Sequence, residues 1–198
     1  MHPEVSAVLE RVVTDRRALH RIPEPAREER LTAAYLAATL HELGLSPRLN
    51  IGGHGLVCDL TPLEPEAGGQ RVALRADMDG IRVEERTGLP FSSVHTGLMH
   101  ACGHDGHLAM LLGAARIFAA HPPRRLRLRL LFQPAEEQFG GARDLIADGA
   151  LDGVNRVFGA HLWSWLPTGT VAACPGPMMA QTERFTVDVT ARGGHAAL

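Results

Sequence analysis

Residues 99–137, MHACGHDGHLAMLLGAARIFAAHPPRRLRLRLLFQPAEE, hold a polar motif, a helix-like segment and a strand-like segment in direct succession. From residue 105 to about 120 the apolar residues recur at helical spacing, and the apolar run 126–132 is short and bounded by turn residues, as strands are. This run alternates Arg with Leu, so we expect it to lie near a sheet edge or to have a partly wet face. A helix that leads into a strand predicts half of a strand–helix–strand unit.

The chain repeats this pattern on both sides. Short apolar runs predict strands, and helical spacing predicts helices on either side of them. Because the apolar strands alternate with helices, we expect an α/β fold with a largely parallel sheet, covered by helices and entered by right-handed crossovers. The further predicted helices cover about 5–19, 29–43 and 141–150, and the further predicted strands cover 55–60, 71–76, 156–162 and 170–174.

The sequence changes character after residue 174. The stretch PGPMM, 175–179, reads as a hinge, and residues 184–190 alternate apolar and polar side chains as a strand does. A single strand at a chain terminus is marginal by itself. We therefore expect one domain over residues 1–180 and the start of a second, unfinished domain over residues 181–198.

Composition excludes several kinds of chemistry. All twenty basic residues are Arg, so no Schiff base can form on Lys and a P-loop lysine is absent. Neither G-x-S-x-G nor G-x-G-x-x-G occurs, which argues against a serine nucleophile elbow and a dinucleotide site. Three widely spaced Cys argue against a disulfide framework. Eleven His, close to Asp, Glu and Cys, point instead to metal.

Size and charge suggest an ordinary soluble protein. The 198 residues carry a net charge of -2 and are 45% hydrophobic, as in one globular domain with part of a second. No apolar run approaches the roughly 18 residues that span a bilayer, and no signal peptide is evident. Mixed charges give no basic surface for nucleic acid or an anionic membrane. We expect a cytoplasmic protein without nucleic-acid or membrane partners.

Polar residues follow the ends of three predicted strands. Asp77 and Asp79 come after RVALRA, Glu136 and Glu137 come after LRLRLLF, and His161 closes RVFGAHL. The carboxyl ends of strands in an open α/β sheet form the ligand crevice. We therefore expect these side chains to meet the HACGHDGH motif at one rim of the sheet.

The motif HACGHDGH, 100–107, is the densest polar cluster. Cys102 and His104 flank one Gly, so both side chains can reach a common site, and thiolate plus imidazole suits zinc or another borderline divalent ion. Alternatively, Asp105 is only a helix N-cap and Cys102 is a small buried residue. Convergence with Glu137 and His161 favours the metal interpretation.

Paired carboxylates offer a division of roles. Glu136 and Glu137 are adjacent on a loop, so one can bind metal while the other faces substrate water, as metal-assisted hydrolysis requires. A solvated acidic loop is the alternative. Asp77 and Asp79 face the same way and could orient a ligand His. Asp79 is the better candidate, although a turn at a strand end also explains it.

These motifs together resemble one known family. The set is similar to the aminoacylase/hippurate hydrolase family of binuclear metallo-amidohydrolases, which includes plant auxin-amino-acid hydrolases. The match runs through essentially all of the chain in the family's order, and MHACGHDGH with QPAEE is highly specific. The matching stretches are LHRIPEP (19–25), ALRADMDGIRVEE (73–85), MHACGHDGHLAMLLGAA (99–115), LLFQPAEEQFGGA (130–142), FGAHLW (158–163), GTVAACPGPMMA (169–180) and RGGHAA (192–197).

The resemblance implies roles for single residues. Glu136 looks like the general acid/base, and Asp79 looks like the partner of a metal ligand. His195 resembles a lid-domain histidine that reaches an active site, often of the neighbouring subunit, and stabilises the oxyanion. The residues that look like ligands of two divalent ions, manganese or zinc with cobalt or nickel as further candidates, are Cys102, His104, Glu137 and His161.

The resemblance also implies a fold and an activity. The family has a zinc-peptidase-like α/β catalytic domain with a mostly parallel mixed sheet, interrupted by a smaller α+β lid domain through which the full-length protein is expected to form a homodimer. It hydrolyses N-acyl or N-aroyl amino acids to a carboxylate and a free amino acid. Dipeptidase or N-acetyl-diaminopimelate deacetylase activity is the alternative. Because family members are about twice this length, we expect an N-terminal part that lacks a further ligating His. A catalytically incomplete metal-binding fragment is therefore a second alternative.

Overall fold

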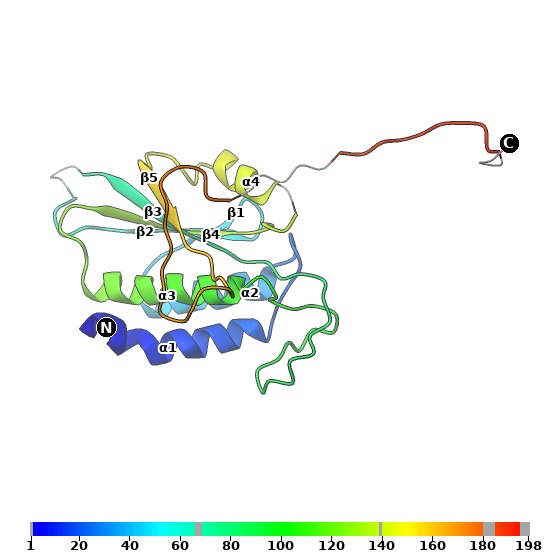
Figure 1. The fold of residues 1–198 in the computed structure, drawn as a ribbon. Helices are drawn as coiled ribbons and strands as arrows, with labels where there is room; N and C mark the ends of the chain where they lie inside the picture. The colour runs from blue at the N-terminus through cyan, green and yellow to red at the C-terminus, as the bar shows by residue number, and fades with distance from the viewer. Residues whose placement is uncertain (1, 66–68, 139, 180–184, 195–198) are drawn as a thin grey trace. The chain divides into compact units, whose positions relative to one another are not determined.

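A mixed, open sheet forms the centre of the first of two compact units, Met1–Leu162 and Trp163–Leu198 (Figure 1). The computed structural model describes residues 2–65, 69–138, 140–179 and 185–194, and over these it contains five strands in the order β1-β2-β4-β3-β5. The pairs β1–β2 and β2–β4 are antiparallel, whereas β4–β3 and β3–β5 are parallel. The strands are β1 (Arg48–Ile51), β2 (Gly55–Leu60), β3 (Arg71–Asp77), β4 (Arg127–Gln133) and β5 (Arg156–Gly159).

Helices cover both faces of this sheet, which confirms the predicted α/β fold (Figure 1), although only two of the four strand pairs are parallel, fewer than the expected largely parallel sheet would have. Leu112 of α3 packs with Phe132 of β4 in the larger core, and Leu145 of α4 packs in a smaller core on the opposite face. A Cβ at Gly113 of α3 would lie 2.7 Å from the Val12 side chain of α1, so this glycine lets the two helices approach closely. The helices are α1 (Pro3–His20), α2 (Arg30–Glu42), α3 (His104–Ala120) and α4 (Gly141–Ala147).

Local signals account for the ends of α1 and α2. Pro3 occupies the first turn of α1, where its fixed φ and missing N–H are tolerated. Gly44 follows α2 with φ 74, and its N–H donates to the His41 carbonyl while that of Leu45 donates to the Leu40 carbonyl. This pair of bonds is a Schellman motif, at the glycine that the sequence predicts as the helix stop.

Strand β4 lies in the middle of the sheet, so the expected edge or partly wet position of residues 126–132 is wrong. Six of its seven residues are buried. Arg129 is 5% exposed, and its Nε and Nη2 donate to the Asp59 carboxylate of β2 at 2.7 and 2.8 Å. Its Nη1 donates to the carbonyl oxygens of Ala150 and Asp152. A buried guanidinium is tolerated here because its donors are paired.

The remaining differences concern short or unpaired strands. Strand β1 is present although the sequence does not predict it. The strands predicted over 170–174 and 184–190 are wrong, since residues 170–174 and the described residues 185–190 are exposed and form no strand. An extended segment needs a neighbour for its N–H and C=O groups, and within the described chain neither segment has one. The domain boundary expected at residues 180 and 181 stays a prediction.

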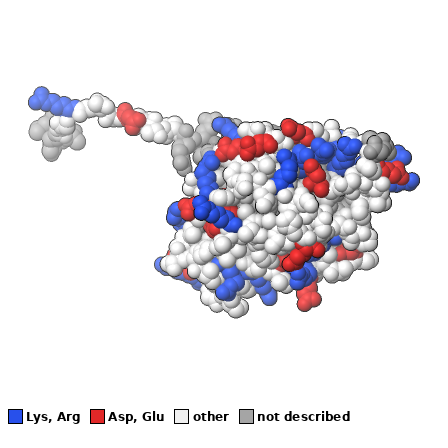
Figure 2. All heavy atoms as spheres, turned by 180° about the vertical axis from the view of Figure 1, so that it is seen from behind, with Lys and Arg blue, Asp and Glu red and all other residues white. Residues whose placement is uncertain are grey.

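Charged side chains of both signs are interspersed on the face drawn in Figure 2. Glu64, for example, lies 2.5 Å from Arg124 and 3.0 Å from Arg125. In the part of the chain that the structure describes, every helix is too short or too polar to cross a bilayer.

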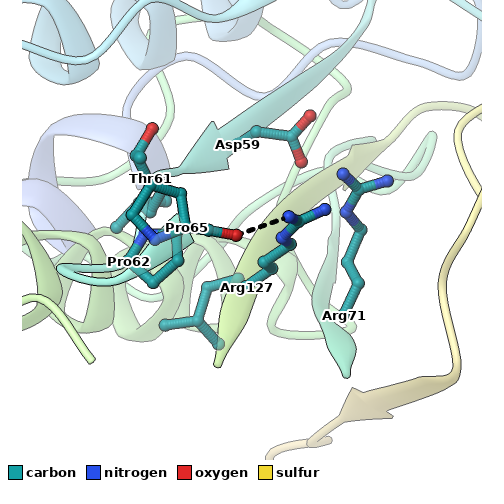
Figure 3. A pocket seen from close by; sticks show the side chains of 8 residues that line it. Asp59, Thr61, Pro62, Pro65, Arg71 and Arg127 are labelled. Atoms are coloured by element: carbon teal, nitrogen blue, oxygen red, sulfur yellow. Dashed lines mark hydrogen bonds between the residues drawn. The ribbon is translucent and has the colours of Figure 1, made fainter. Parts of the chain in front are cut away.

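A cavity of about 200 Å³ lies at the amino-terminal ends of β3 and β4 (Figure 3). Asp59, Arg71 and Arg127 line it, and Arg127 donates to the main-chain oxygen of Pro65 at 2.8 Å. The cavity is therefore at the opposite end of these strands from the polar residues that follow them.

Candidate metal centre

The loops that follow β3 and β4 emerge side by side because these strands are parallel, with Asp77 opposite Gln133. Asp79 lies just beyond β3, and Glu136 and Glu137 lie just beyond β4. The first turn of α3 brings His104 into the same region. The carboxyl edge of the sheet thus gathers imidazole and carboxylate groups at the rim where the sequence predicts them.

Among the side chains at this edge of the sheet, His104 offers the most buried nitrogen that could bind a metal ion. Its side chain is 1% exposed, and Nδ1 donates to the main-chain oxygen of Asp79 at 2.8 Å, which leaves the lone pair on Nε2. Within the described chain Nε2 has no hydrogen-bond partner. Carboxylate oxygens lie 3.6, 3.8 and 3.9 Å from it, on Asp77, Glu137 and Glu136 respectively. A buried polar atom without a partner costs roughly 1–3 kcal/mol, and a divalent cation on Nε2 would remove that cost and offset the negative charges.

The electrostatics around His104 also favour a cation. Burial lowers the pKa of His104, but the interaction with Asp79 and the charges of Asp77 and Glu137 outweigh burial and raise it. The surrounding carboxylates therefore stabilise positive charge at this position, whether it is carried by a proton or by a metal ion.

Cys102 and His161 lie next to His104. Cys102 Sγ is 3.5 Å from His161 Nε2, and the ligand atoms of the three residues all lie within 4.8 Å of one another. Burial, with the charges of Glu137 and Glu136, raises the pKa of the Cys102 thiol to about 12. A divalent cation would reverse this preference and stabilise the thiolate.

Main-chain hydrogen bonds hold the loop that carries Glu136 and Glu137. The Asp79 carboxylate accepts both of their N–H groups, each at 3.0 Å, and Glu29 Oε1 accepts the N–H of Ala135 at 2.7 Å. Asp79 therefore contacts His104 through its carbonyl oxygen, with its Oδ1 also 3.4 Å from His104 Nδ1, and it contacts the loop through its carboxylate. The sequence predicts a contact with a ligand His but gives no sign of the contact with the loop.

The Glu136 carboxylate is partly exposed and lies near His104. Its side chain is 42% exposed, so water can reach it, while its Oε2 stays 3.9 Å from His104 Nε2. Burial and the charges of Glu137 and Asp77 raise the pKa of Glu136, against the opposing effect of His104. A raised pKa brings a carboxyl group closer to the pH at which it can both accept and return a proton.

Asp77 and His107 form a buried pair. The sequence indicates Asp77 as a possible partner of a ligand His, but it gives His107 no role of its own. His107 Nδ1 donates to Asp77 at 2.6 Å, and its Nε2 accepts the N–H of Leu162 at 2.9 Å. Burial would raise the pKa of Asp77, but the bond from His107 and the charge of His104 outweigh burial and hold it far below the usual range. Since both ring nitrogens are engaged, His107 anchors the segment beside His161. Its spacing of three residues from His104, on one helix face, was the available signal.

The residues present fit divalent metal. Sulfur, imidazole nitrogen and carboxylate oxygen all converge on His104, a donor set that suits borderline divalent ions. His195 lies outside the described residues, so its predicted role stays a prediction. In the described part of the chain the candidate ligand groups are Cys102 with His104 and His161, Asp77 with His104 and His107, and His104 with Glu136 and Glu137.

Comparison with known proteins identifies the family. The sequence pattern of peptidase family M20/M25/M40 matches residues 73–198, which is more than half of the chain. The chain belongs to peptidase family M20/M25/M40. The family resemblance seen in the sequence is confirmed by this match together with the relatives described next.

Two curated relatives of this M20/M25/M40 chain are named as enzymes that cleave amide bonds. The N-acetyl-L-cysteine deacetylase of Bacillus subtilis (strain 168) is 43% identical over 195 residues, which are 98% of this chain and 46% of that protein. The N-acyl-L-amino acid amidohydrolase of Geobacillus stearothermophilus is 41% identical over 201 residues, with coverage of 98% and 54%. The chain thus spans about half the length of the curated relatives it matches.

A solved M20 structure that binds two metal ions has a similar fold. The YXEP protein of Bacillus subtilis, a dinuclear metal binding peptidase from the M20 family, matches with a TM-score of 0.77 at 35% identity, over 82% of this chain and 45% of that one. Together with the convergence of donors on His104, this likeness supports binding of divalent metal ions by the M20/M25/M40 chain.

Proposed function

We propose that the protein hydrolyses the amide bond of N-acyl or N-aroyl amino acids, releasing a carboxylate and a free amino acid, with the help of two divalent metal ions. The observation that carries this proposal is the buried Nε2 of His104, which has no hydrogen-bond partner in the described chain and faces carboxylates, with Cys102 and His161 beside it. The deacetylase and amidohydrolase names of the relatives support an acylated amino acid as the substrate class.

The proposed ligands differ in chemical type. Thiolate and imidazole favour zinc, whereas the added carboxylate also suits manganese, with cobalt or nickel as further candidates. Bound ions would supply Lewis-acid polarisation of the amide carbonyl and of a water molecule. The proposed ligands are Cys102, His104, Glu137 and His161.

Glu136 would carry the proton transfers. Its carboxylate takes a proton from the attacking water and returns it to the leaving nitrogen, so that a neutral amine departs. Asp79 supports this step because it holds the N–H groups of Glu136 and Glu137 and fixes His104 through its carbonyl oxygen. His195 would stabilise the oxyanion from a lid domain that begins near residue 181. We further propose that the lid domain forms a homodimer and that the protein is cytoplasmic.

Side-by-side hydrolysis tests this function. The metal-loaded protein is assayed with hippurate, N-acetyl amino acids, dipeptides and N-acetyl-diaminopimelate, and we expect turnover of the first two classes. Preference for dipeptides or for N-acetyl-diaminopimelate would replace the proposal with the corresponding alternative activity. Metal binding without any hydrolysis would favour the second alternative, a catalytically incomplete metal-binding fragment. Glu136→Gln is the control, since it should lower turnover roughly 10²- to 10⁴-fold while metal content persists.

A further inference from the structure

Glu29 is a buried carboxylate that the proposed chemistry does not use. Its residue is 0% exposed, and it occupies the N-cap position of α2. A side chain at this position ordinarily accepts an N–H of its own helix, but that of Glu29 does not. Glu24 takes this role, since its carboxylate accepts the N–H groups of Leu31 at 2.9 Å and Thr32 at 2.8 Å. The Glu29 side chain is thereby available for a contact outside α2.

That contact is with the loop of the metal centre. Glu29 Oε1 accepts the N–H of Ala135 at 2.7 Å, across 106 residues of sequence. Ala135 has φ 51, in the left-handed region that residues other than Gly seldom adopt and that persists where surrounding contacts enforce it. Three consecutive N–H groups, from residues 135 to 137, are thus each accepted by a buried carboxylate of Glu29 or Asp79.

Burial of two carboxylates at this point is costly. Burial raises the pKa of Glu29, and the nearby charge of Asp79 acts in the same direction. Isolated charge in an apolar environment is tolerated only where specific hydrogen bonds compensate for lost solvation. The Ala135 N–H provides such compensation at Oε1, whereas Oε2 of Glu29 has no hydrogen-bond partner in the described chain. Ala135 stands one residue before Glu136 and two before Glu137.

We propose that Glu29 is a positioning residue of this site, which fixes the loop through the Ala135 N–H so that Glu136 and Glu137 face His104. The expected effect on turnover rests on the proposed function. The expected effects on the loop and on metal affinity do not. Glu29 itself would touch neither substrate nor metal. It links the start of α2 to the carboxyl end of β4.

The test compares Glu29→Ala and Glu29→Gln with Glu24→Ala as the matched control. Glu24 is also a buried carboxylate at the start of α2, but it caps the helix and does not touch the loop. Three quantities are measured on the purified chain: hydrogen exchange of the amides at 135–137, the Kd for Zn²⁺ and Mn²⁺, and kcat and KM with an N-acetyl amino acid.

Glu29→Ala should speed exchange at 135–137 roughly 10- to 100-fold, since a hydrogen bond to a charged group is lost. It should also weaken metal binding roughly 10- to 100-fold and lower kcat more than KM. Glu29→Gln keeps an oxygen acceptor, so its loop exchange, metal affinity and kcat should lie close to the wild-type values. Glu24→Ala should speed exchange in the first turn of α2 and leave residues 135–137, metal affinity and kcat near wild type.

Wild-type exchange at 135–137 and wild-type metal affinity in Glu29→Ala would overturn the proposal, as would equal effects of Glu24→Ala on the loop. If Glu29→Ala does not fold, Glu29→Asp takes its place, because it keeps the charge but shortens the reach by one methylene. We expect Glu29→Asp to show the same faster loop exchange and the same weaker metal binding as Glu29→Ala. Wild-type values would overturn the proposal. If the wild type hydrolyses no substrate, the proposed function fails, while exchange and metal affinity still decide the role of Glu29.

Discussion

Removal of the Asp59 carboxylate should destabilise the first unit by about 3 kcal/mol. Arg129 is 5% exposed and directs two hydrogen bonds to Asp59, at 2.7 and 2.8 Å. In Asp59→Ala the guanidinium keeps the carbonyl oxygens of Ala150 and Asp152, but its Nε and Nη2 lose their acceptors. Breaking a buried ion pair costs roughly 3–5 kcal/mol. The lower end applies because the Asp59 side chain is 46% exposed, at the rim of the cavity in Figure 3.

Urea unfolding followed by circular dichroism measures this loss, with Asp144→Ala as the matched control. Asp144 also pairs with an arginine, Arg27, at 2.9 Å, but the two side chains are 43% and 53% exposed. Loss of such a surface pair should cost less than about 1 kcal/mol. If Asp59→Ala is destabilised no more than Asp144→Ala, the reasoning that the Arg129 pair allows β4 to occupy the centre of the sheet is refuted.

The same variant gives a pH dependence of definite sign. Burial opposes ionisation of Asp59, but the hydrogen bonds and charge of Arg129 outweigh burial and lower its pKa in the folded protein. The contribution of the carboxylate is therefore complete above the unfolded-state pKa, about 3.9, and is lost as the pH falls through the lower folded-state value. The difference between wild type and Asp59→Ala should be constant near neutral pH and shrink below about pH 4. A difference that grows on acidification contradicts this account.

Three further predictions concern the metal centre. Glu136→Gln should keep its metal yet lose roughly 10²- to 10⁴-fold in turnover, whereas Glu137→Gln should lose metal first and regain part of the rate in excess metal. Mass spectrometry of metal content beside hydrolysis assays would reveal whether the two roles are exchanged. Cys102→Ser should lower metal occupancy and change metal preference, because a serine hydroxyl stays protonated at neutral pH and is a poorer ligand than a thiolate. Unchanged stoichiometry and selectivity would exclude Cys102 as a ligand. Asp79→Asn should raise the Kd for metal roughly 10- to 100-fold, because one of the two loop N–H groups loses its acceptor. An unchanged Kd in calorimetric titration would contradict this role of Asp79.

Elements defined by nearby residues were predictable from the sequence. The run 55–60 coincides with β2, and Gly44 marks the end of α2, because both signals are local. The position of β4 was not predictable in this way. Its alternating arginines indicate a wet face, and Arg129 can be buried because its donors find acceptors far along the chain, on Asp59, Ala150 and Asp152. Alternation at 184–190 likewise says nothing about whether a partner strand is present.

In the candidate site too, nearby residues predict some features, whereas long-range contacts determine others. Parallel strands share a direction, so strand ends alone place Asp79 and Glu136 at one rim. His107 was within reach of the helical period, because it follows His104 by three residues. The contact of Glu29 with Ala135 was not, since no spacing rule connects residues 106 positions apart.

The scattering of the proposed ligands along the chain has a consequence for folding. In an unfolded chain only Cys102 and His104 are close neighbours, and Glu137 and His161 join them after β3 has paired with β4 and β5. Such non-local parallel pairing is intrinsically slow. Metal at 100 times its Kd would then favour the folded chain by about 2.7 kcal/mol. Occupancy of the centre during synthesis would therefore report that the parallel half of the sheet has closed.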